Sequence, residues 1–341
     1  FCLLPSPQLS SSPDLPYPIP YTVYDTHDNK GNYVNRLIID TDPGLDDAHA
    51  ILMAAAHPAT EIVALTVVGG NVPLERTVAN ACTILDVVGC DAPVYAGCAG
   101  ALLRESERAA HVHGDDGLGN SNHAPSARHV APQHAVEALI AHANAEPGEL
   151  TLVAIGPLTN VALATRLDPA LPTKYKRLVI MGGAIRAMGN TSSVTAEFNI
   201  FADTEAAAIV LHAWPMLTLV SWETTMDYGL MFPDWHAMLA KDTPRAQFLQ
   251  RITGEVVAYS ENVLKRAKMY SADPLAMAVV LEPDIVQRAE QRRVDVELAG
   301  HHTRGQTVVD WSGRSGLPPN AEIVLEVDRE RHRALLELAT H

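Results

Sequence analysis

The chain has 341 residues, of which 47% are apolar and 19% are charged, so it is long enough to bury a sizeable core and is not a disordered protein. Its 25 basic and 40 acidic residues give a formal net charge of -15. A field of that sign repels phosphate groups, which excludes nucleic acid and anionic membranes as expected partners.

The first 33 residues are rich in Pro and Ser and begin FCLLPSPQLSSS. This composition predicts a loosely ordered arm. The apolar triplet CLL is too short for the core of a signal peptide, and no run of 18 or more apolar residues follows that would span a membrane. We therefore expect an arm over residues 1–33 and a single domain over residues 34–341.

Strand-like and helix-like segments alternate through the rest of the chain. Short apolar runs rich in β-branched residues predict strands at 36–42, 61–70, 151–156, 176–184, 216–222 and 322–328, the last of them at a sheet edge. Segments with helical apolar spacing lie at 46–57, 74–89, 158–167 and 204–214, and the stretch 101–148 is less regular. This alternation predicts an α/β fold, a mostly parallel open sheet with a Rossmann-like core and helices on both faces.

The four cysteines, Cys2, Cys82, Cys90 and Cys98, form no C-x-x-C pair, and no histidine stands at zinc-finger spacing from them. The pattern is typical of free thiols in a reducing compartment. It favours a cytoplasmic protein.

The loop after the first predicted strand, DTDPGLDD at 40–47, holds four carboxylates within eight positions. Ligand sites of open parallel sheets lie at such strand-to-helix loops. A helix N-cap would account for one of the four carboxylates. The others cannot all stay ionised at close range without a cation or raised pKa values. Because the ligands would all be oxygens, the loop indicates a hard divalent cation, Ca²⁺ or Mg²⁺, rather than zinc.

Together with five further segments, this loop resembles the signature of the inosine–uridine family of nucleoside hydrolases. The matching segments are DTDPGLDDAHAILMAA (40–55), TVVGGNVPLERTVANACTIL (66–85), VHGDDGLG (112–119), AIGPLTNVALA (154–164), VIMGGAIRAMGN (179–190) and TAEFNIFADTEAA (195–207). The resemblance spans roughly residues 35–280. It implies a mostly parallel sheet with Ca²⁺ at the strand ends. It also implies hydrolysis of the N-glycosidic bond of ribonucleosides, an activity of nucleoside salvage and catabolism, and assembly into homodimers or homotetramers.

The resemblance also implies a set of metal ligands. Asp42 corresponds to a ligand that also deprotonates the attacking water, and Asp47 to a second carboxylate ligand. Ile155 corresponds to a ligand through its backbone carbonyl, which explains why its side chain need not be polar. Asp273, in YSADPLAMAVV, would complete the set from the far end of the chain.

The family's substrate contacts map onto a further set of residues. Asp46 would accept hydrogen bonds from the ribose hydroxyls. The remaining sugar contacts correspond to Asn71, Asn190, Glu197 and Asn199. Met181 and Phe198 correspond to the walls of the pocket, and His113 to the residue that faces the base.

Several of these residues have a simpler structural interpretation. Asn190 and Asn199 could cap turns, and Glu197 could be a surface carboxylate. His113 could be a loop histidine without contact to substrate. Three other residues near the motifs have expected roles outside the site: His49 is expected to be structural, Asp40 to support the metal ligands without binding the ion, and Trp222, in the W-E-T-T segment that would end a strand, to belong to the core.

One departure from the family concerns the leaving group. Many relatives carry a histidine immediately before the last aspartate, where it protonates the departing base, and this chain has Ala272. A catalytically impaired nucleoside or ribose sensor of the same fold is therefore an alternative. A second alternative is a haloacid-dehalogenase-like phosphatase, which also begins with D-x-D. That family needs Thr or Val where Gly44 stands, and the negative charge of the chain disfavours phosphate.

Overall fold

The computed structural model describes residues 34–104 and 107–341, and residues 34–341 form one compact unit. The arm predicted over 1–33 lies outside the described residues. Within the described residues, none of the helices combines the length and apolar character needed to cross a bilayer.

The centre of the fold is an eight-stranded sheet in the order β3-β2-β1-β4-β5-β6-β12-β9. All neighbouring pairs are parallel except β12 with β9. The strands are β1 (Asn35–Thr41), β2 (Thr60–Val67), β3 (Val94–Ala96), β4 (Leu150–Ala154), β5 (Arg177–Met181), β6 (Leu217–Val220), β9 (Val286–Arg292) and β12 (Ala321–Val327). The predicted α/β class with a mostly parallel sheet is confirmed. The predicted edge position of the last strand is wrong, because the antiparallel β9 covers the outer side of β12.

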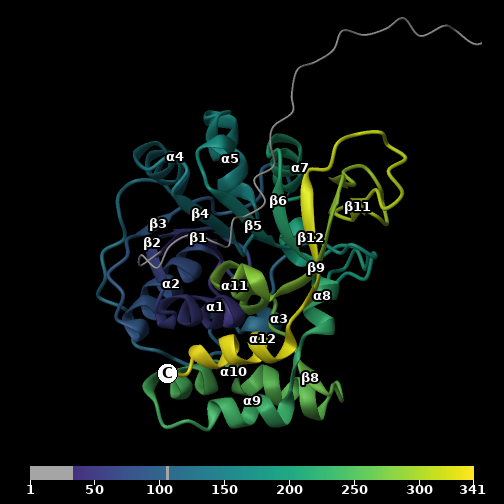
Figure 1. Ribbon diagram of the computed structural model, residues 1–341. Coiled ribbons are helices and arrows are strands. Elements are labelled where there is room, and N and C mark those ends of the chain that lie inside the picture. The colour runs from purple at the N-terminus through teal and green to yellow at the C-terminus, as the bar shows by residue number, and fades with distance from the viewer. Residues whose placement is uncertain (1–33, 105–106) are drawn as a thin grey trace, which may run out of the picture. The chain divides into compact units, whose positions relative to one another are not determined.

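Helices cover both faces of this sheet (Figure 1). On one face lie α4 (Ala135–Ala145), α5 (Thr159–Leu167) and α7 (Thr204–Ala213), and on the other α1 (Leu45–Ala56), α2 (Leu74–Val88) and α11 (Ala272–Leu281). The strands are buried on both faces because their side chains alternate between two cores. In β1, Leu37 and Ile39 pack with α1 and α11, whereas Ile38 packs with α4 and α5.

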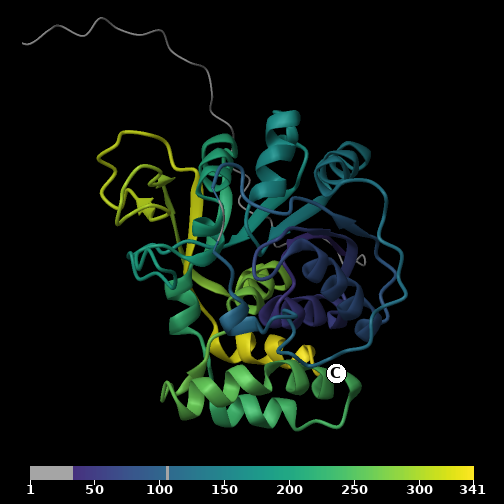
Figure 2. The same cartoon turned by 180° about the vertical axis from the view of Figure 1, so that it is seen from behind.

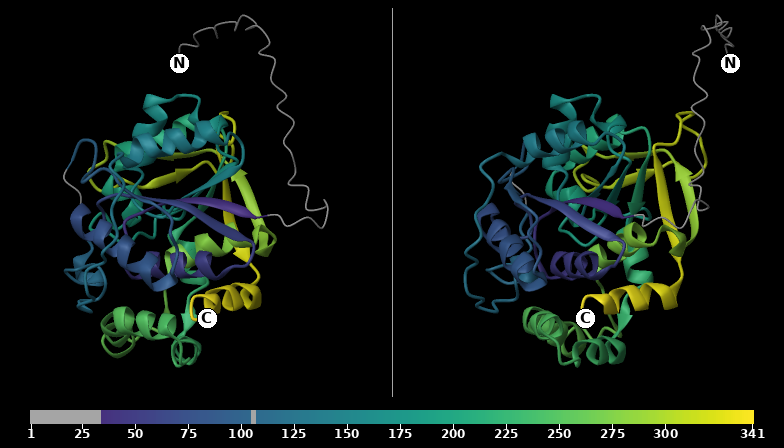
Figure 3. Two further views of the ribbon diagram at one scale, coloured as in Figure 1. Left: turned by 90° about the vertical axis from the view of Figure 1, so that its left-hand side faces the viewer. Right: turned by 60° about the vertical axis from the view of Figure 1, so that its left-hand side comes forward.

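A further group of helices packs beneath α1 and α11. It consists of α9 (Phe232–Leu239), α10 (Pro244–Asn262) and α12 (Arg329–Leu338), which Figure 3 shows as the lowest elements of the molecule. Short elements α3 (Ala110–His113), α6 (Phe198–Ala202) and α8 (Trp222–Asp227) follow strands or loops on this side. The 3-10 turns η1 (Leu171–Thr173) and η2 (Pro283–Ile285) connect longer elements.

Two small antiparallel pairs complete the architecture. β7 (Leu230–Met231) pairs with β8 (Lys268–Met269) and links α9 to the end of α10. β10 (Val294–Val296) pairs with β11 (Thr307–Val309), and Figure 2 shows this hairpin beside the β12 end of the sheet.

Candidate active site

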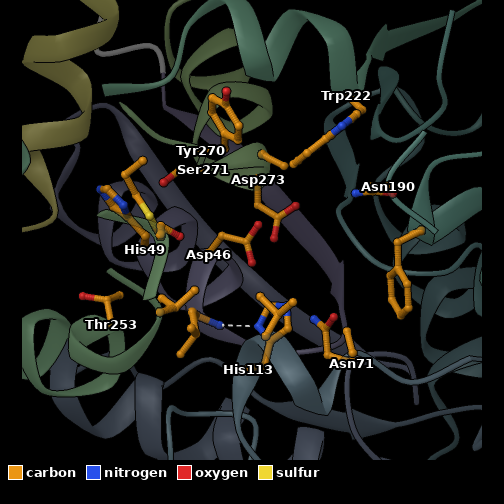
Figure 4. A pocket seen from close by; sticks show the side chains of 18 of the residues that line it. Asp46, His49, Asn71, His113, Asn190, Trp222, Thr253, Tyr270, Ser271 and Asp273 are labelled. Carbon is orange, nitrogen blue, oxygen red and sulfur yellow. Dashed lines mark hydrogen bonds between the residues drawn. The ribbon is translucent and has the colours of Figure 1, made fainter. Parts of the chain in front are cut away.

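A cavity of about 360 Å³ lies beyond the carboxyl ends of β1, β4 and β5, where the strand order of a parallel sheet places ligand sites. The sequence predicted ten of its lining residues as site residues: Asp46, Asn71, His113, Ile155, Met181, Asn190, Glu197, Phe198, Asn199 and Asp273. Figure 4 shows Asp46 and Asp273 facing each other in the middle of the cavity, with Asn71 and His113 on one side and Trp222 and Tyr270 on the other.

The loop between β1 and α1 is held in a fixed shape by its own polar groups. Gly44 is the N-cap of α1, and its N–H donates to Asp47 Oδ2 at 2.9 Å, while Thr41 Oγ1 donates to the other oxygen of Asp47. The turn has no room for a side chain at Gly44, since a Cβ there would lie 2.3 Å from His113 Nδ1. The DPG sequence therefore places Asp42 and Asp47 in a dry, crowded turn.

Asp42 is completely buried, and only one of its two carboxylate oxygens has a hydrogen-bond partner. Its Oδ2 accepts a hydrogen bond from the backbone N–H of Asn71 at 2.7 Å, and its Oδ1 has no partner. Gly70 and Gly156 close around it, because a Cβ at either position would come within 2.6 Å of the carboxylate. An unpaired oxygen on a buried carboxylate is costly unless a proton or a cation satisfies it.

Three further carboxylates converge beside Asp42. One oxygen each from Asp46, Asp47 and Asp273 lies within 4.8 Å of the other two, and Asp42 is not a member of this group. The predicted ligands Asp47 and Asp273 therefore come together although 226 positions separate them, and Asp46, predicted as a ribose contact, is their third neighbour. Burial, and after it the charge of Asp46, raises the pKa of Asp273 well above its usual range and that of Asp47 to about 7.

These donors fit a hard divalent cation. Carboxylates crowded in a dry site either take up protons or have their negative charge neutralised by a bound cation. The unpartnered oxygen of Asp42 offers a further ligand. The backbone carbonyl of Ile155, at the end of β4, accepts one hydrogen bond, from Asn199 Nδ2 at 3.1 Å, and keeps a second lone pair. The backbone carbonyl of Asp40 accepts from the N–H of Ile155 at 2.9 Å, and its buried carboxylate accepts from Thr66 Oγ1 and Asn160 Nδ2. Its role in supporting the ligands stays a prediction.

Glu197 and Asn199 lie in the interior, so neither the surface position considered for Glu197 nor the turn cap considered for Asn199 is correct. The carboxylate of Glu197 accepts from the backbone N–H groups of Gly183, Asn199 and Ile200, and burial raises its pKa to about 7. Asn199 Nδ2 donates to the carbonyls of Ile155 and Met181. The start of α6 therefore ties the ends of β4 and β5 together at the cavity.

His113 lies at the end of α3 and is 8% exposed. Its Nδ1 accepts the backbone N–H of Leu45 at 3.1 Å, so the neutral ring carries its hydrogen on Nε2. Burial lowers the pKa of His113, which favours that neutral form. The ring thus has a structural partner and also lines the cavity. Asn71 Nδ2 likewise donates to Asp42 and Asp47 while it lines the cavity.

The side of the cavity formed by α8–α11 contains lining residues that are absent from the predicted site. Trp222 is only partly buried; it begins α8 instead of ending a strand, and it meets Tyr270 edge to face at 5.9 Å. Trp222 packs against the core, as predicted, and in addition lines the cavity. Other lining residues on this side are Trp235, Thr253, Val256, Tyr259, Ser260, Arg266, Met269 and Tyr270. Tyr270 lies in the YSADPLAMAVV segment. The others belong to no compact motif: the apolar ones have the spacing of an ordinary core helix, and Thr253, Ser260 and Arg266 carry no local signal.

His49 has structural contacts and also lines the cavity (Figure 4), so its expected structural role stays a prediction. It is 1% exposed, its Nε2 lies 3.0 Å from the carbonyl of Leu336, and its ring packs against Trp235. Cys82, Cys90 and Cys98 are free thiols.

The model of the family described as "Inosine-uridine preferring nucleoside hydrolase" matches residues 37–334. The chain belongs to this family. The inosine-uridine preferring nucleoside hydrolase of Leishmania major is 36% identical over 311 residues, which cover 88% of this chain and 96% of the relative. The pyrimidine-specific ribonucleoside hydrolase RihB of Escherichia coli O157:H7 is 33% identical over 303 residues, 89% of this chain and 96% of the relative.

Solved structures of nucleoside hydrolases share the fold. The plant nucleoside hydrolase PpNRh1 superposes with a TM-score of 0.83 at 32% identity, covering 90% of this chain and 98% of that one, and an inosine-guanosine nucleoside hydrolase gives the same values. The predicted family and enzyme class, a ribonucleoside hydrolase, are confirmed. Membership in this family excludes the phosphatase alternative.

Proposed function

We propose that this nucleoside hydrolase uses Ca²⁺ to cleave the N-glycosidic bond of ribonucleosides, releasing ribose and a free purine or pyrimidine base. Asp42, Asp47, Asp273 and the carbonyl of Ile155 would hold the ion. The observation that carries the proposal is the buried carboxylate of Asp42, which has an unpartnered oxygen and whose pKa is raised by burial and by the charges of Asp47 and Asp46, two members of the cluster of three carboxylates. Oxygen-only donors of this kind favour calcium over softer metals.

When bound, calcium lowers the pKa of a coordinated water and holds hydroxyl groups of the ribose. Asp42 accepts the proton of the attacking water, a role that suits a carboxylate with one free oxygen. Asp46, Asn71, Asn190, Glu197 and Asn199 would bind the ribose. Bond cleavage builds positive charge on the sugar ring, and the surrounding carboxylates stabilise that charge in a site shielded from water.

His113 would contact the base, and Met181 and Phe198 would form walls of the pocket. The relatives differ in the bases that their names record, from pyrimidine-specific to inosine-guanosine. A panel of inosine, guanosine, adenosine, uridine and cytidine, followed through the release of reducing sugar with and without Ca²⁺, tests the proposed reaction and assigns the base preference.

The same panel separates the enzyme from a sensor that has lost catalytic power with its leaving-group histidine. Release of ribose with many turnovers per chain supports the hydrolase. Binding of ribose or nucleoside in a thermal-shift titration without any release of sugar would support the sensor. We also propose a homodimer or homotetramer, which the resemblance to the family supports and which light scattering coupled to size-exclusion chromatography tests.

A further inference from the structure

Glu223 is a buried carboxylate outside the set of predicted site residues. It lies in the first turn of α8 and is 1% exposed. Its Oε2 accepts the backbone N–H of Ile185 at 2.8 Å, and its Oε1 accepts those of Arg186 at 2.7 Å and Met188 at 3.2 Å. Three backbone donors on one side chain from another element are a strong tether, because hydrogen bonds to an ionised carboxylate are about twice as strong as neutral ones.

The segment that Glu223 holds leads directly to the cavity. It follows β5 and carries Asn190, whose side chain lines the cavity (Figure 4). Ala187, inside the segment, has a φ of +59°, a conformation that L residues rarely adopt. Such a backbone persists only when its surroundings fix it. The three N–H groups that Glu223 binds lie on both sides of Ala187, so the carboxylate holds this turn in place.

Backbone bonds also secure the ends of the segment, and inside it the N–H of Ala187 donates to the carbonyl of Ala184 at 3.2 Å and that of Gly189 to the carbonyl of Val194 at 2.8 Å. Trp222 N–H donates to the carbonyl of Gly183 at 2.9 Å at the start, and Asn190 N–H donates to the carbonyl of Ala196 at 3.1 Å at the end. Between these points the backbone N–H groups of 185, 186 and 188 all point at one carboxylate.

We propose that Glu223 is a positioning residue of this hydrolase, which fixes the 185–188 turn and thereby aims Asn190 at the substrate. The inference rests on the assignment of Asn190 as a ribose contact in the proposed function. Glu223 itself does not line the cavity. Its effect on turnover must therefore pass through the segment that it holds.

The Glu223→Gln substitution keeps the size of the side chain but turns one acceptor oxygen into an NH₂ group that faces a backbone N–H. Displacing a substrate contact by about 1 Å can cost on the order of 10²-fold in rate, so we expect kcat/KM on the best nucleoside to fall about 10- to 100-fold. Asn190→Ala should produce a loss of similar size by removing the contact itself. In the Asn190→Ala background, Glu223→Gln should cost less than about threefold, because residues that act as one unit are not additive.

Asp227→Asn is the matched control. Asp227 also lies on α8 and pairs with Arg186 of the same segment, but through side chains that are more than half exposed, at 3.2 Å. A surface pair of this kind contributes little. The control should keep kcat/KM within about twofold of wild type.

The experiment is the double-mutant cycle in kcat/KM, with the melting temperature and its rise on adding Ca²⁺ measured for every variant. Strong coupling between Glu223→Gln and Asn190→Ala in kcat/KM, with an unchanged rise of the melting temperature on adding Ca²⁺, supports the positioning role. A merely structural defect would lower the melting temperature without coupling to Asn190. An equal cost of Glu223→Gln in both backgrounds would overturn it. If Glu223→Gln does not yield folded protein, Glu223→Asp, which keeps the charge but shortens the reach, serves in the same cycle.

The two proposals fail in different ways. A wild-type value of kcat/KM for Asn190→Ala would contradict the ribose-contact assignment and, with it, the role of Glu223. If Asn190→Ala gives the expected loss of kcat/KM but the effects of Glu223→Gln and Asn190→Ala simply add in the double mutant, the proposed function stands and only the role of Glu223 is contradicted.

Discussion

The Asp47→Asn substitution measures how much the ionisation of one buried carboxylate in the cluster destabilises the metal-free fold. Burial and the neighbouring charge of Asp46 raise the pKa of Asp47 from 3.8 to about 7 in the metal-free chain. The folded state therefore holds this proton more tightly than the unfolded state does. The corresponding contribution to stability is fully present below about pH 4 and disappears as the pH rises through about 7.

The size of the effect follows from the pKa shift. A shift from 3.8 to about 7 amounts to about 4 kcal/mol, of which about 3 kcal/mol is lost between pH 5 and pH 8. The Asp47→Asn variant cannot ionise at this position and is free of that loss. The difference in unfolding free energy between variant and wild type should therefore shift by about 3 kcal/mol in favour of the variant over this pH range in metal-free buffer.

Urea unfolding followed by circular dichroism at pH 5 and pH 8 measures this difference, and taking it between two proteins cancels the titrating groups that do not interact with Asp47. The pKa values of Asp42 and Asp273 are raised in part by the charge of Asp47, so their response to its loss has the same sign and adds to the difference. Addition of Ca²⁺ at pH 8 should stabilise the wild type strongly and the variant weakly, since the ion binds only the folded state. Parallel pH dependence of the two proteins, with no difference in their response to Ca²⁺, would refute the reasoning.

Three further predictions concern turnover. Asp42→Asn should lower kcat by about 10³-fold or more while the melting curve stays cooperative, because an amide cannot accept the proton of water; a turnover above a tenth of wild type would contradict the assignment. Loss of the ribose 2′-hydroxyl should cost about 10³-fold in kcat/KM, and 5′-phosphates should be poor substrates of a chain with a net charge of -15; comparable rates on inosine and its monophosphate would end this idea. Ala272→His should raise nucleoside turnover by about 10²-fold but leave p-nitrophenyl riboside nearly unchanged, because only the poor leaving group needs an acid; equal gains on both substrates, or no gain on either, would argue against a missing acid.

The sequence predicts the parts of the site that are local along the chain. DTDPGLDD places three of the relevant carboxylates in one turn, so the spacing alone indicates a cation site, and β1 and α1 begin and end within one or two positions of the predicted limits. Asp273 differs, because nothing near YSADP shows that α11 returns to the end of β1. The resemblance to the family predicted it, and the contact with Asp46 and Asp47 is a product of tertiary packing.

The far wall of the cavity could not be predicted from the sequence for a physical reason. Trp222 and Tyr270 meet across 48 positions of chain, and the strand expected to reach Trp222 ends at Val220, where Ser221 caps α8 through the N–H of Thr224. An apolar residue at the end of a strand has the same local signal in a core and in a cavity wall. The covering strand β9, with the charged sequence VQRAEQR, lacks the apolar alternation that identifies strands.

Calcium titration of the metal-free enzyme tests the role of the carboxylate cluster most directly. Protein stripped by a chelator and checked for metal content is supplied with increasing Ca²⁺ while the release of ribose from the best nucleoside is followed. We predict no turnover without the ion and recovery that saturates at one bound Ca²⁺ per chain. Full turnover in protein shown to contain no divalent metal would contradict the assignment of Asp42, Asp47 and Asp273 as a catalytic metal site.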